Sequence, residues 1–312
     1  MESSNNNKWV FIVNPIAGNG FGKLMVPIIR DKISRYGIDG EIIQTERSGH
    51  AVELSRQYLD QGYGVIVGVG GDGTANEVAR PLVNKKNVVF GVIPAGTGND
   101  FVQVTGFHDR MTENDWELFF RKQVIPMDAG LVNGMIFING MGLGFDAQVA
   151  AENYSGPGVV KKGGKHKYIW HIIKTILFFR EKRMTASYGG SRTETDCFIN
   201  TVSIGRRFAG GFLLTPGALA DDGLLDVCSI KRLNLIQRLK LFMKVPKGEH
   251  IKDKKVFYFQ TNGMTIEFPG KVPFHVDGEL NFSEHFDISI MPGALNIIYN
   301  PDGNHFFSKS GN

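Results

Sequence analysis

The sequence has few cysteines and no long apolar run, and each absence excludes a class of protein. Cysteine occurs only as Cys197 and Cys228, both in apolar, strand-like runs without metal-ligand spacing, which excludes a disulfide scaffold. No stretch reaches about 18 consecutive apolar residues, so no membrane-spanning helix is predicted. The polar N-terminus, residues 1–7, contains no hydrophobic signal core. We therefore expect a cytoplasmic chain with two buried thiols.

A strong net charge is also lacking, which removes one reason to expect a nucleic-acid partner. The 312 residues carry a formal charge of +4 at pH 7, and so mild an excess does not by itself indicate nucleic acid. Apolar residues make up 42% of the chain, which is enough for substantial cores. Because this length exceeds one average domain, we expect two domains.

The stretch from Val65 to Glu77, VIVGVGGDGTANE, is the most informative part of the chain. An apolar run leads into glycines, and a helix-compatible run from Ala75 to Leu82 follows. Glycines allow the backbone to approach a phosphate closely, and a helix start offers unpaired N–H groups. Asp72 adds a negative charge, which suits a phosphate site when Mg²⁺ or a metal-bound water lies between. The stretch therefore predicts a phosphate site.

Two interpretations of this motif stay open from the residues alone. The simpler one is a tight strand-to-helix turn with a capping aspartate. The other rests on likeness, because GGDGT at residues 70–74 is similar to a motif of three enzyme groups. These are the lipid kinases of the diacylglycerol and sphingosine type, the NAD kinases and the 6-phosphofructokinases. All three transfer a phosphoryl group from a nucleotide, so the motif indicates a reaction class rather than a substrate.

Strands and helices alternate through the first part of the chain. Helices are expected at residues 23–36 and 50–60, between apolar runs that read as strands at 9–13, 41–45, 65–69 and 88–93. This alternation predicts a doubly wound, mostly parallel sheet. Glycine-rich loops follow three of the strands, at 14–20, 70–74 and 94–101. Since ligands bind at the carboxyl ends of such strands, the loops predict one shared site.

From about residue 124 the pattern changes to successive strands separated by turn signals. Strands are expected near 135–140, 195–205, 224–230, 255–259, 264–268 and 286–291. This pattern predicts an antiparallel, β-rich second domain with a helical insertion near 165–182. The predicted domains are 1–130, an α/β nucleotide-binding domain, and 131–292, the β-rich domain.

With these residues in hand, the chain resembles the bacterial diacylglycerol kinase and sphingosine-kinase-like lipid kinase family. The motifs stand in the family's order: Asn14-Pro15 with Gly18, GGDGT followed by Asn76-Glu77, PAGTGND at 94–100, ADDGLLD at 220–226 and VDGE at 276–279. Together they extend over most of the chain and are far more specific than GGDGT alone. The later signatures of NAD kinases are not found, nor is the 6-phosphofructokinase pattern around the catalytic aspartate.

The resemblance implies the fold of the whole chain. It implies an N-terminal doubly wound α/β domain and a C-terminal β-sandwich-like domain, with the active site in the cleft between them. It also implies that the segment at about 293–312 returns to the first domain, which the sequence pattern alone does not show.

The resemblance also implies roles at the nucleotide. Asp72 and Asp100 would hold Mg²⁺ at the phosphates of ATP, because phosphoryl transfer depends on positioning and charge neutralisation. A helix N-cap is the simpler reading of Asp100. Glu77 is expected near the ribose or adenine, or else as an exposed helix carboxylate. The residues expected to line the nucleotide are Asn14, Gly18, Gly71, Gly73, Thr74, Gly96 and Thr97.

Asp277 is the residue expected to act as general base, because the family places its catalytic aspartate in this late motif. Asp-Gly between strand-like residues is also a strong hairpin signal, and the two readings can coexist. Glu279 is expected as a supporting carboxylate at the nucleotide. His275 is expected as a half-buried strand residue.

A second magnesium ion is implied near Asp222, where the family has a structural ion. Asp222, with the carbonyl of Leu224, would supply hard oxygen ligands, and Asp221 is a weaker candidate. The simpler reading is an acidic turn before a strand.

We therefore predict an ATP- and Mg²⁺-dependent lipid kinase that phosphorylates a primary hydroxyl of a membrane lipid, with diacylglycerol as the leading substrate. The alternatives are an NAD-kinase-type kinase of a soluble substrate and a non-catalytic nucleotide-binding regulatory protein. The complete set of aspartates argues against the regulatory protein. The choice of lipid, ATP against GTP, and a homodimer stay open.

A basic stretch suggests how such a chain would reach a lipid. Residues 161–183 carry eight basic side chains and one acidic one, a sum of +7, so the rest of the +4 chain sums to −3. The stretch predicts either an amphipathic helix with a solvated basic face or peripheral docking on anionic lipid at the inner membrane face. A second basic excess lies between Lys231 and Lys255.

Overall fold

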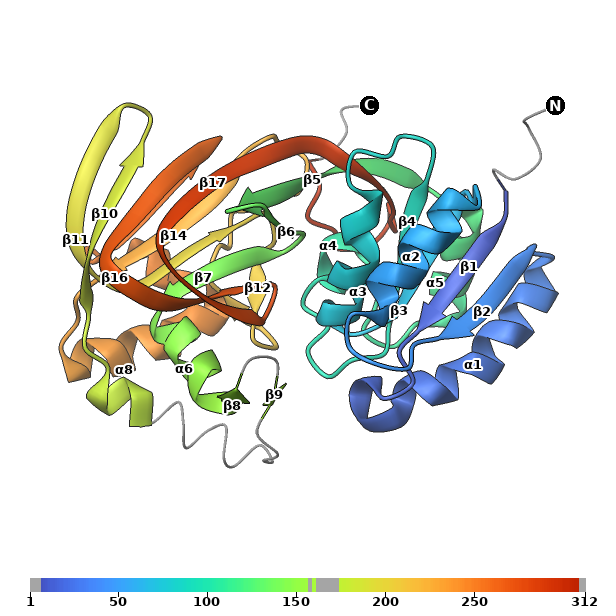
Figure 1. Ribbon diagram of the computed structural model, residues 1–312, viewed down its shortest axis with the longest axis horizontal. Coiled ribbons are helices and arrows are strands. Elements are labelled where there is room, and N and C mark those ends of the chain that lie inside the picture. The colour runs from blue at the N-terminus through green and yellow to red at the C-terminus, as the bar shows by residue number, and fades with distance from the viewer. Residues whose placement is uncertain (1–6, 157–158, 161–173, 309–312) are drawn as a thin grey trace. The chain divides into compact units, whose positions relative to one another are not determined.

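The computed structural model describes residues 7–156, 159–160 and 174–308 of the chain. The chain divides into two compact units, which Figure 1 draws. Unit 1 consists of Met1–Ala129, Leu219–Gly223 and Met291–Asn312, and unit 2 consists of Gly130–Ala218 and Leu224–Ile290. The short segment Leu219–Gly223 has no counterpart in the predicted domain boundaries, because no sequence pattern assigns it to unit 1.

Unit 1 contains a parallel sheet. Its strands are β1 (Trp9–Val13), β2 (Gly40–Gln44), β3 (Val65–Gly70) and β4 (Val89–Pro94), in the order β2-β1-β3-β4. The last part of β17 (Glu279–Ile298) pairs in parallel with β4 through Ile297 and Phe90. Every residue of β1 and β3 is buried, as expected where helices cover both faces of a sheet. The doubly wound α/β fold is therefore confirmed.

The helices of unit 1 connect these strands. They are α1 (Ala17–Tyr36), α2 (His50–Asp60), α3 (Asp72–Ala79), the 3₁₀ turn η1 (Arg80–Leu82), α4 (Val102–Thr105) and α5 (Glu113–Arg121). Residues 18–20 of α1 have non-helical backbone angles, so the regular helix begins after Gly20. The expected start at Lys23 is close to this point. No element was expected at 113–121, although Thr112 and Asp115 form a capping box there.

An aromatic core joins α5 to the sheet of unit 1. Trp9 and Phe11 of β1 stack with ring centroids 6.0 Å apart, and both rings meet Phe120 of α5. Phe119 is fully buried beside them. Because each aromatic side chain buries a large apolar area, this cluster fixes α5 over the first strand.

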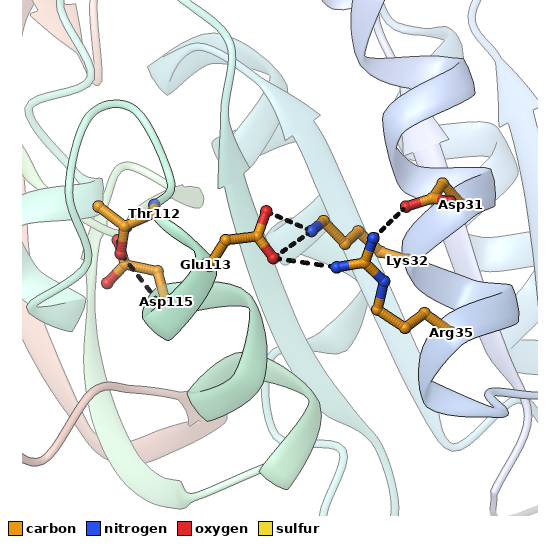
Figure 2. A network of polar contacts seen from close by, with 6 residues as sticks. All are labelled: Asp31, Lys32, Arg35, Thr112, Glu113 and Asp115. Carbon is orange, nitrogen blue, oxygen red and sulfur yellow. Dashed lines mark hydrogen bonds and ion pairs between the residues drawn. The ribbon is translucent and has the colours of Figure 1, made fainter.

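A buried lysine links α1 to α5 (Figure 2). Lys32 is 4% exposed, and its Nζ lies 2.6 Å from both carboxylate oxygens of Glu113. Arg35 donates to the same carboxylate at 3.2 Å. Burying an unpaired charge is costly, so Glu113 makes the burial of Lys32 tolerable. The hydrogen bond from Lys32, with the charges of Lys32 and Arg35, lowers the pKa of Glu113 below its ordinary value of 4.5.

Unit 2 is antiparallel, as expected. Its strands are β5 (Val124–Val132, which begins in unit 1), β6 (Met135–Phe137), β7 (Gly140–Gly144), β10 (Lys182–Tyr188), β11 (Ser191–Ser203), β14 (Leu225–Lys231), β15 (Val256–Thr261), β16 (Gly263–Val276) and the first part of β17. Short pairs add β8 (Tyr154–Gly156) with β9 (Val159–Val160) and β12 (Arg207–Phe208) with β13 (Phe212–Leu213).

Two bulged strands give unit 2 its layered form. The first part of β11 pairs with β10 and its second part with β7, and the register shifts between Cys197 and Ile199. In the same way β16 pairs with β10 and then with β7, with a register shift between Glu267 and Val272. Bulges bend a strand and let it change partner. The expected strand at 135–140 is in fact two, β6 and β7.

Unit 2 also contains helices beyond the one insertion expected. They are α6 (Phe145–Asn153), α8 (Leu235–Lys244) and the 3₁₀ turns η2 (Val245–Lys247) and η3 (Glu249–Lys252). The expected insertion at 165–182 lies partly outside the described residues, and 174–178 is helical within them. Cys197 and Cys228 are buried, unpaired thiols. Throughout the described ranges, no helix is both long and apolar enough to cross a membrane.

The Lys32–Glu113 ion pair predicts a pH-dependent stability. Glu113→Gln removes the charged partner of Lys32, so it should lower the free energy of unfolding at neutral pH. Folding lowers the pKa of Glu113 below its ordinary value of 4.5. The contribution of the ionised carboxylate to the free energy of unfolding is therefore fully present above pH 4.5, and it is lost as the pH falls through the folded-state pKa. The stability difference between wild type and variant, measured by urea unfolding at a series of pH values, should therefore vanish in acid.

Glu117→Gln on the same helix is the matched control, since Glu117 pairs with exposed Arg121 one turn away. Its effect should be small at every pH. A Glu113→Gln difference that persists undiminished in acid would contradict the assignment.

Candidate active site

The three glycine-rich loops meet at the carboxyl edge of the sheet in unit 1. Asn14, after β1, donates from its N–H to the carbonyl of Val69 at 2.9 Å. Ala95, after β4, donates to the carbonyl of Gly70 at 2.7 Å. The loops follow neighbouring parallel strands, so their convergence is a consequence of the sheet.

The first loop turns through left-handed backbone. Gly18, Asn19 and Gly20 have φ values of 57°, 56° and 94°, which L-residues other than glycine and asparagine rarely adopt. A Cβ at Gly18 would lie 2.2 Å from the carbonyl oxygen of Ala95. Glycine is therefore required at 18 both for its φ and for the close approach of the third loop.

The second and third loops touch at two glycines. A Cβ built on Gly96 would lie 2.5 Å from the Cα of Gly71, and one on Gly71 would lie 3.2 Å from the Cα of Gly96. Gly73, in the first turn of α3, has no atom within 4 Å of such a Cβ. Gly71 and Gly96 therefore permit a contact between two backbones, whereas Gly73 leaves open space.

A cavity of about 290 Å³ lies among these loops. It is lined by Asn14, Ala17, Gly18, Gly71, Asp72, Gly73, Thr74, Gly96, Thr97 and Gly98. Asn14 donates from Nδ2 to Oγ1 of Thr74 at 3.1 Å, which joins the first loop to α3. The structure therefore brings together, around one cavity, the residues that the sequence places along the nucleotide in this unit, with the exceptions of Glu77 and Asp100.

Asp72 supports the third loop. Its Oδ1 accepts the N–H of Phe101 at 2.8 Å. Burial raises the pKa of Asp72, and the N–H groups of Phe101, Asp100 and Asn99 act in the opposite direction. The N-cap of α3 is Gly71 without a side-chain cap, so the capping reading of Asp72 is wrong.

Asn99 and Asp100 complete the third loop. Asn99, at φ 51°, accepts the N–H of Gly96 at 2.9 Å and donates to its carbonyl at 3.2 Å, which closes the loop on itself. Asp100 is 7% exposed, and it is outside the lining of the cavity among the described residues. The N-cap of α4 is Phe101, so the N-cap reading of Asp100 is wrong as well.

Glu77 lies away from the cavity, at the start of α2. Its carboxylate oxygens accept the N–H groups of Gly49 and Ala51, at 3.0 and 3.3 Å. Helix starts favour such a partner because their first N–H groups are unpaired and positively polarised. The half-buried side chain is therefore a cap for a neighbouring helix, so the alternative reading as an exposed helix carboxylate is wrong, and its contact with a nucleotide stays a prediction.

An acidic cluster joins the separate segments of unit 1, and sequence reasoning named its members Asp221 and Asp222 but missed Asp128. Asp128 of β5 is 2% exposed; it accepts the N–H of Gly223 at 2.8 Å and that of Gly293 at 2.7 Å. Asp221 accepts the N–H and hydroxyl of Ser308. Burial raises the pKa of Asp128, and the charges of Asp222 and Asp221 add to this. The signal that the sequence offered for Asp128 was its position as a single carboxylate within the apolar strand β5.

The described residues contain no group of three or more His, Cys, Asp or Glu side chains arranged to hold a metal ion by themselves. A Mg²⁺ ion does not need three protein side chains, because it is usually held by one or two carboxylates together with substrate phosphates. The half-buried Asp72 in the cavity wall fits that requirement. Asp222 lies in the turn before β14, beside Asp128 and Asp221, and a second ion at Asp222 and Leu224 stays a prediction.

In unit 2, Asp277 forms the turn between β16 and β17. Asp277 and Gly278 have φ values of 46° and 87°, and Val276 pairs with Glu279, which confirms the predicted hairpin. The carboxylate of Asp277 accepts three N–H groups, from Ile138 at 2.7 Å, Asn139 at 3.1 Å and Gly140 at 2.7 Å. These bonds fix its orientation and favour its ionised form.

His275 lies two residues before Asp277 and is half-buried in β16, as expected. Its Nε2 is 3.2 Å from Oδ2 of Asp146 in α6. A Cβ at Gly142 would lie 2.1 Å from that oxygen and 2.4 Å from Nε2, so the pair requires glycine beneath it. No sequence signal identified Asp146, because its partner is 129 residues away.

The glycine contact at the cavity predicts opposite effects for two similar substitutions. Gly96→Ala places a methyl group 2.5 Å from backbone, so it should lower the free energy of unfolding by about 1–3 kcal/mol. Gly73→Ala, the matched control, meets nothing within 4 Å and lies in a helix, so stability should be unchanged or raised by up to about 1 kcal/mol. Urea unfolding measures both, and equal effects would refute the close contact.

Family models match both parts of the chain. The diacylglycerol kinase catalytic domain matches residues 8–132, and the YegS C-terminal NAD kinase beta sandwich-like domain matches residues 140–299. The diacylglycerol kinase of Bacillus subtilis (strain 168) is 26% identical over 290 residues, which cover 92% of each chain. That of Staphylococcus carnosus (strain TM300) is 25% identical over 288 residues, covering 89% of this chain and 93% of the relative.

Solved structures agree with this. A crystal structure from Bacillus anthracis strain Sterne, of a protein provisionally named a diacylglycerol kinase, superposes with a TM-score of 0.76 at 25% identity, covering 95% of this chain and 98% of that one. The glycine loops of unit 1 lie within the first matched domain and the Asp277 turn within the second. The chain belongs to the bacterial diacylglycerol kinase family, whose members are phosphotransferases with an alcohol group as acceptor.

Proposed function

We propose that the chain transfers the terminal phosphoryl group of ATP to the primary hydroxyl of diacylglycerol, giving phosphatidic acid, with Mg²⁺. The observation that carries this proposal is the cavity at the carboxyl edge of the sheet in unit 1, in a chain of the diacylglycerol kinase family. Family membership makes it a lipid kinase that uses a nucleotide with a divalent metal ion. The identity of the lipid, the choice of ATP and the choice of Mg²⁺ are parts of the proposal.

The cavity suits a nucleotide triphosphate because its wall is mostly backbone. Glycines 18, 71, 73 and 96 present no side chain to the space, so N–H groups can approach phosphate oxygens. The first residues of α3, Asp72, Gly73 and Thr74, line the same cavity, and the first N–H groups of a helix have no partner within the helix. Asn14 and Thr74 add an amide and a hydroxyl that are already oriented by their mutual hydrogen bond.

Asp72 and Asp100 are the residues proposed to hold Mg²⁺ at the phosphates. A bound Mg²⁺ supplies charge neutralisation where negative charge accumulates during phosphoryl transfer. Asp72 lies in the cavity wall, and burial makes its ionised form costly without a cation nearby. Asp222 and the Leu224 carbonyl are proposed for a second, structural ion, supported by the negative charges that crowd Asp128.

Asp277 is proposed to accept the proton of the attacking hydroxyl, with Glu279 as a supporting carboxylate. The three N–H groups of residues 138–140 hold the carboxylate in a fixed direction, and a general base must be positioned in this way to reach the proton that it accepts. The same hydrogen bonds give Asp277 a structural role in the turn. A test must therefore separate loss of catalysis from loss of the turn.

Asp277→Asn is the variant for this test. If Asp277 accepts the proton, kcat should fall by about 10²–10⁴-fold, while ATP affinity measured by calorimetry stays near that of wild type. Activity should be measured well below the melting temperature of the variant, because the Asn side chain places an NH₂ group against N–H donors.

Asn139→Ala is the matched control for the turn. It leaves the carboxylate in place but removes the hydrogen bond from Nδ2 of Asn139 to the carbonyl of Arg207, in the segment that Asp277 holds. Loss of stability without a comparable loss of kcat is expected there. Wild-type turnover in Asp277→Asn would leave Asp277 as a hairpin residue only.

The substrate is tested with labelled ATP and a panel of acceptors. We expect label in phosphatidic acid when diacylglycerol is present, and little label with sphingosine, monoacylglycerol or NAD. Omission of Mg²⁺ should abolish incorporation, and GTP in place of ATP shows the donor preference. NAD is included because the family model that matches unit 2 is described as NAD kinase-like in its β-sandwich. Labelled NADP without a labelled lipid would overturn the proposed function.

A further inference from the structure

The helix α8 of unit 2 exposes large apolar side chains along its outer face. Leu235, Ile236, Leu239 and Met243 are 43%, 65%, 50% and 70% exposed. Their spacing of three and four residues places them along one side of the helix. The helix begins with a capping box formed by Asn234 and Gln237, so it is a defined element and not a frayed end.

The inner face of α8 carries a charge instead. Arg238 is 8% exposed and donates to the carbonyls of Leu233, Ile176 and Phe179, at 3.2, 2.6 and 2.9 Å. It also pairs with Glu181 at 2.7 Å. The usual arrangement of a surface helix, with apolar residues inside and charges outside, is therefore partly reversed.

Through these bonds Arg238 fastens the segment 174–181 to α8, and Figure 1 shows the short helix beside α8. This segment exposes Leu177 by 50% and Phe178 by 73%. Of the twelve large apolar residues that are exposed within the described ranges, these two and the four of α8 make up half. Such a concentration on two neighbouring segments marks an interaction surface rather than scattered exposure.

Positive charge is concentrated in the segment that contains the apolar face. Residues 231–255 contain nine lysines and arginines against Glu249 and Asp253, a sum of +7, while the whole chain is +4. Arg238 is neutralised inside by Glu181, and Lys244 lies 3.8 Å from Asp253. Lys240 within α8 and Lys247 just after it are exposed. Exposed apolar residues with lysines beside them are the features of helices that lie in a lipid interface.

We propose that the outer face of α8, together with Leu177 and Phe178, docks on an anionic lipid bilayer. The inference rests on the proposed function in that a lipid kinase must reach a substrate held in a membrane. A helix of ten residues is about 15 Å long, too short to span a bilayer, so it lies along the interface with its apolar side chains inserted. The lysines pair with anionic headgroups, which makes the attachment weaken with salt.

The test uses the full chain and sedimentation with vesicles of equimolar phosphatidylcholine and phosphatidylglycerol. The triple variant Ile236→Gln, Leu239→Gln, Met243→Gln should bind these vesicles at least about tenfold more weakly, because three inserted side chains are lost. Wild type should bind more weakly to pure phosphatidylcholine and at high salt. Glutamine is a good helix former, so the melting temperature should be that of wild type.

The matched control is Leu24→Gln, Ile28→Gln on α1 of unit 1, which also removes exposed apolar residues, 62% and 39% exposed. It should bind vesicles as wild type does. Three outcomes would overturn the proposal. The α8 variant could bind vesicles as tightly as wild type, or the control variant could lose as much binding as the α8 variant. Vesicle binding by wild type could also be independent of lipid charge and salt. A wild-type chain that binds no vesicle would overturn the proposal too.

A second readout separates this proposal from the proposed function. With short-chain diacylglycerol dispersed as monomers, the α8 variant should keep the kcat of wild type, because it differs only in docking. If wild type phosphorylates no lipid yet its vesicle binding depends on α8, the proposed function fails and the docking surface stands. If the α8 variant loses activity on the monomeric substrate to the same extent as on vesicles, the docking role is refuted.

Discussion

The contact of Gly71 with Gly96 is the constraint on which the cavity depends. The backbones of the two loops can approach each other this closely only because neither Gly71 nor Gly96 has a side chain. This contact sets the spacing of the loops after β3 and β4, and the left-handed turn at Gly18 brings the first loop against the same place. The cavity is thus shaped by backbone, and an anion within it would meet N–H groups rather than flexible side chains.

Several polar side chains in each of the two units act first on the protein's own backbone. Asn99 closes its own loop, Asp72 holds Phe101, and Asp277 holds the start of β7. Each satisfies N–H groups that would otherwise be buried without partners, a loss that costs about 1–3 kcal/mol. Pre-organisation of this kind fixes the groups that remain for a ligand, which is how phosphoryl transfer enzymes gain most of their rate.

Much of the fold could be predicted because its signals are local. The apolar runs of β1 and β3, the glycines after them and the Asp277-Gly278 hairpin are each legible within a few residues. The parallel-sheet rule then places the loops together without further information. What could not be predicted depends on distant partners: Glu77 caps α2, Asp146 meets His275, and Asp128 joins Gly223 and Gly293. The turn at 219–223 carries no sequence pattern that assigns it to unit 1.

The late return of the chain has a consequence for synthesis on the ribosome. All three glycine loops have been made once Phe101 is joined, yet β4 remains an open sheet edge until Ile297 pairs with it, and Asp128 lacks Gly223 and Gly293 until both exist. At about 5–20 residues per second, the nascent edge stays uncovered for on the order of ten seconds or more. An unpaired edge of this kind can recruit other strands, so ribosome-associated chaperones would protect this chain most during the making of its second unit.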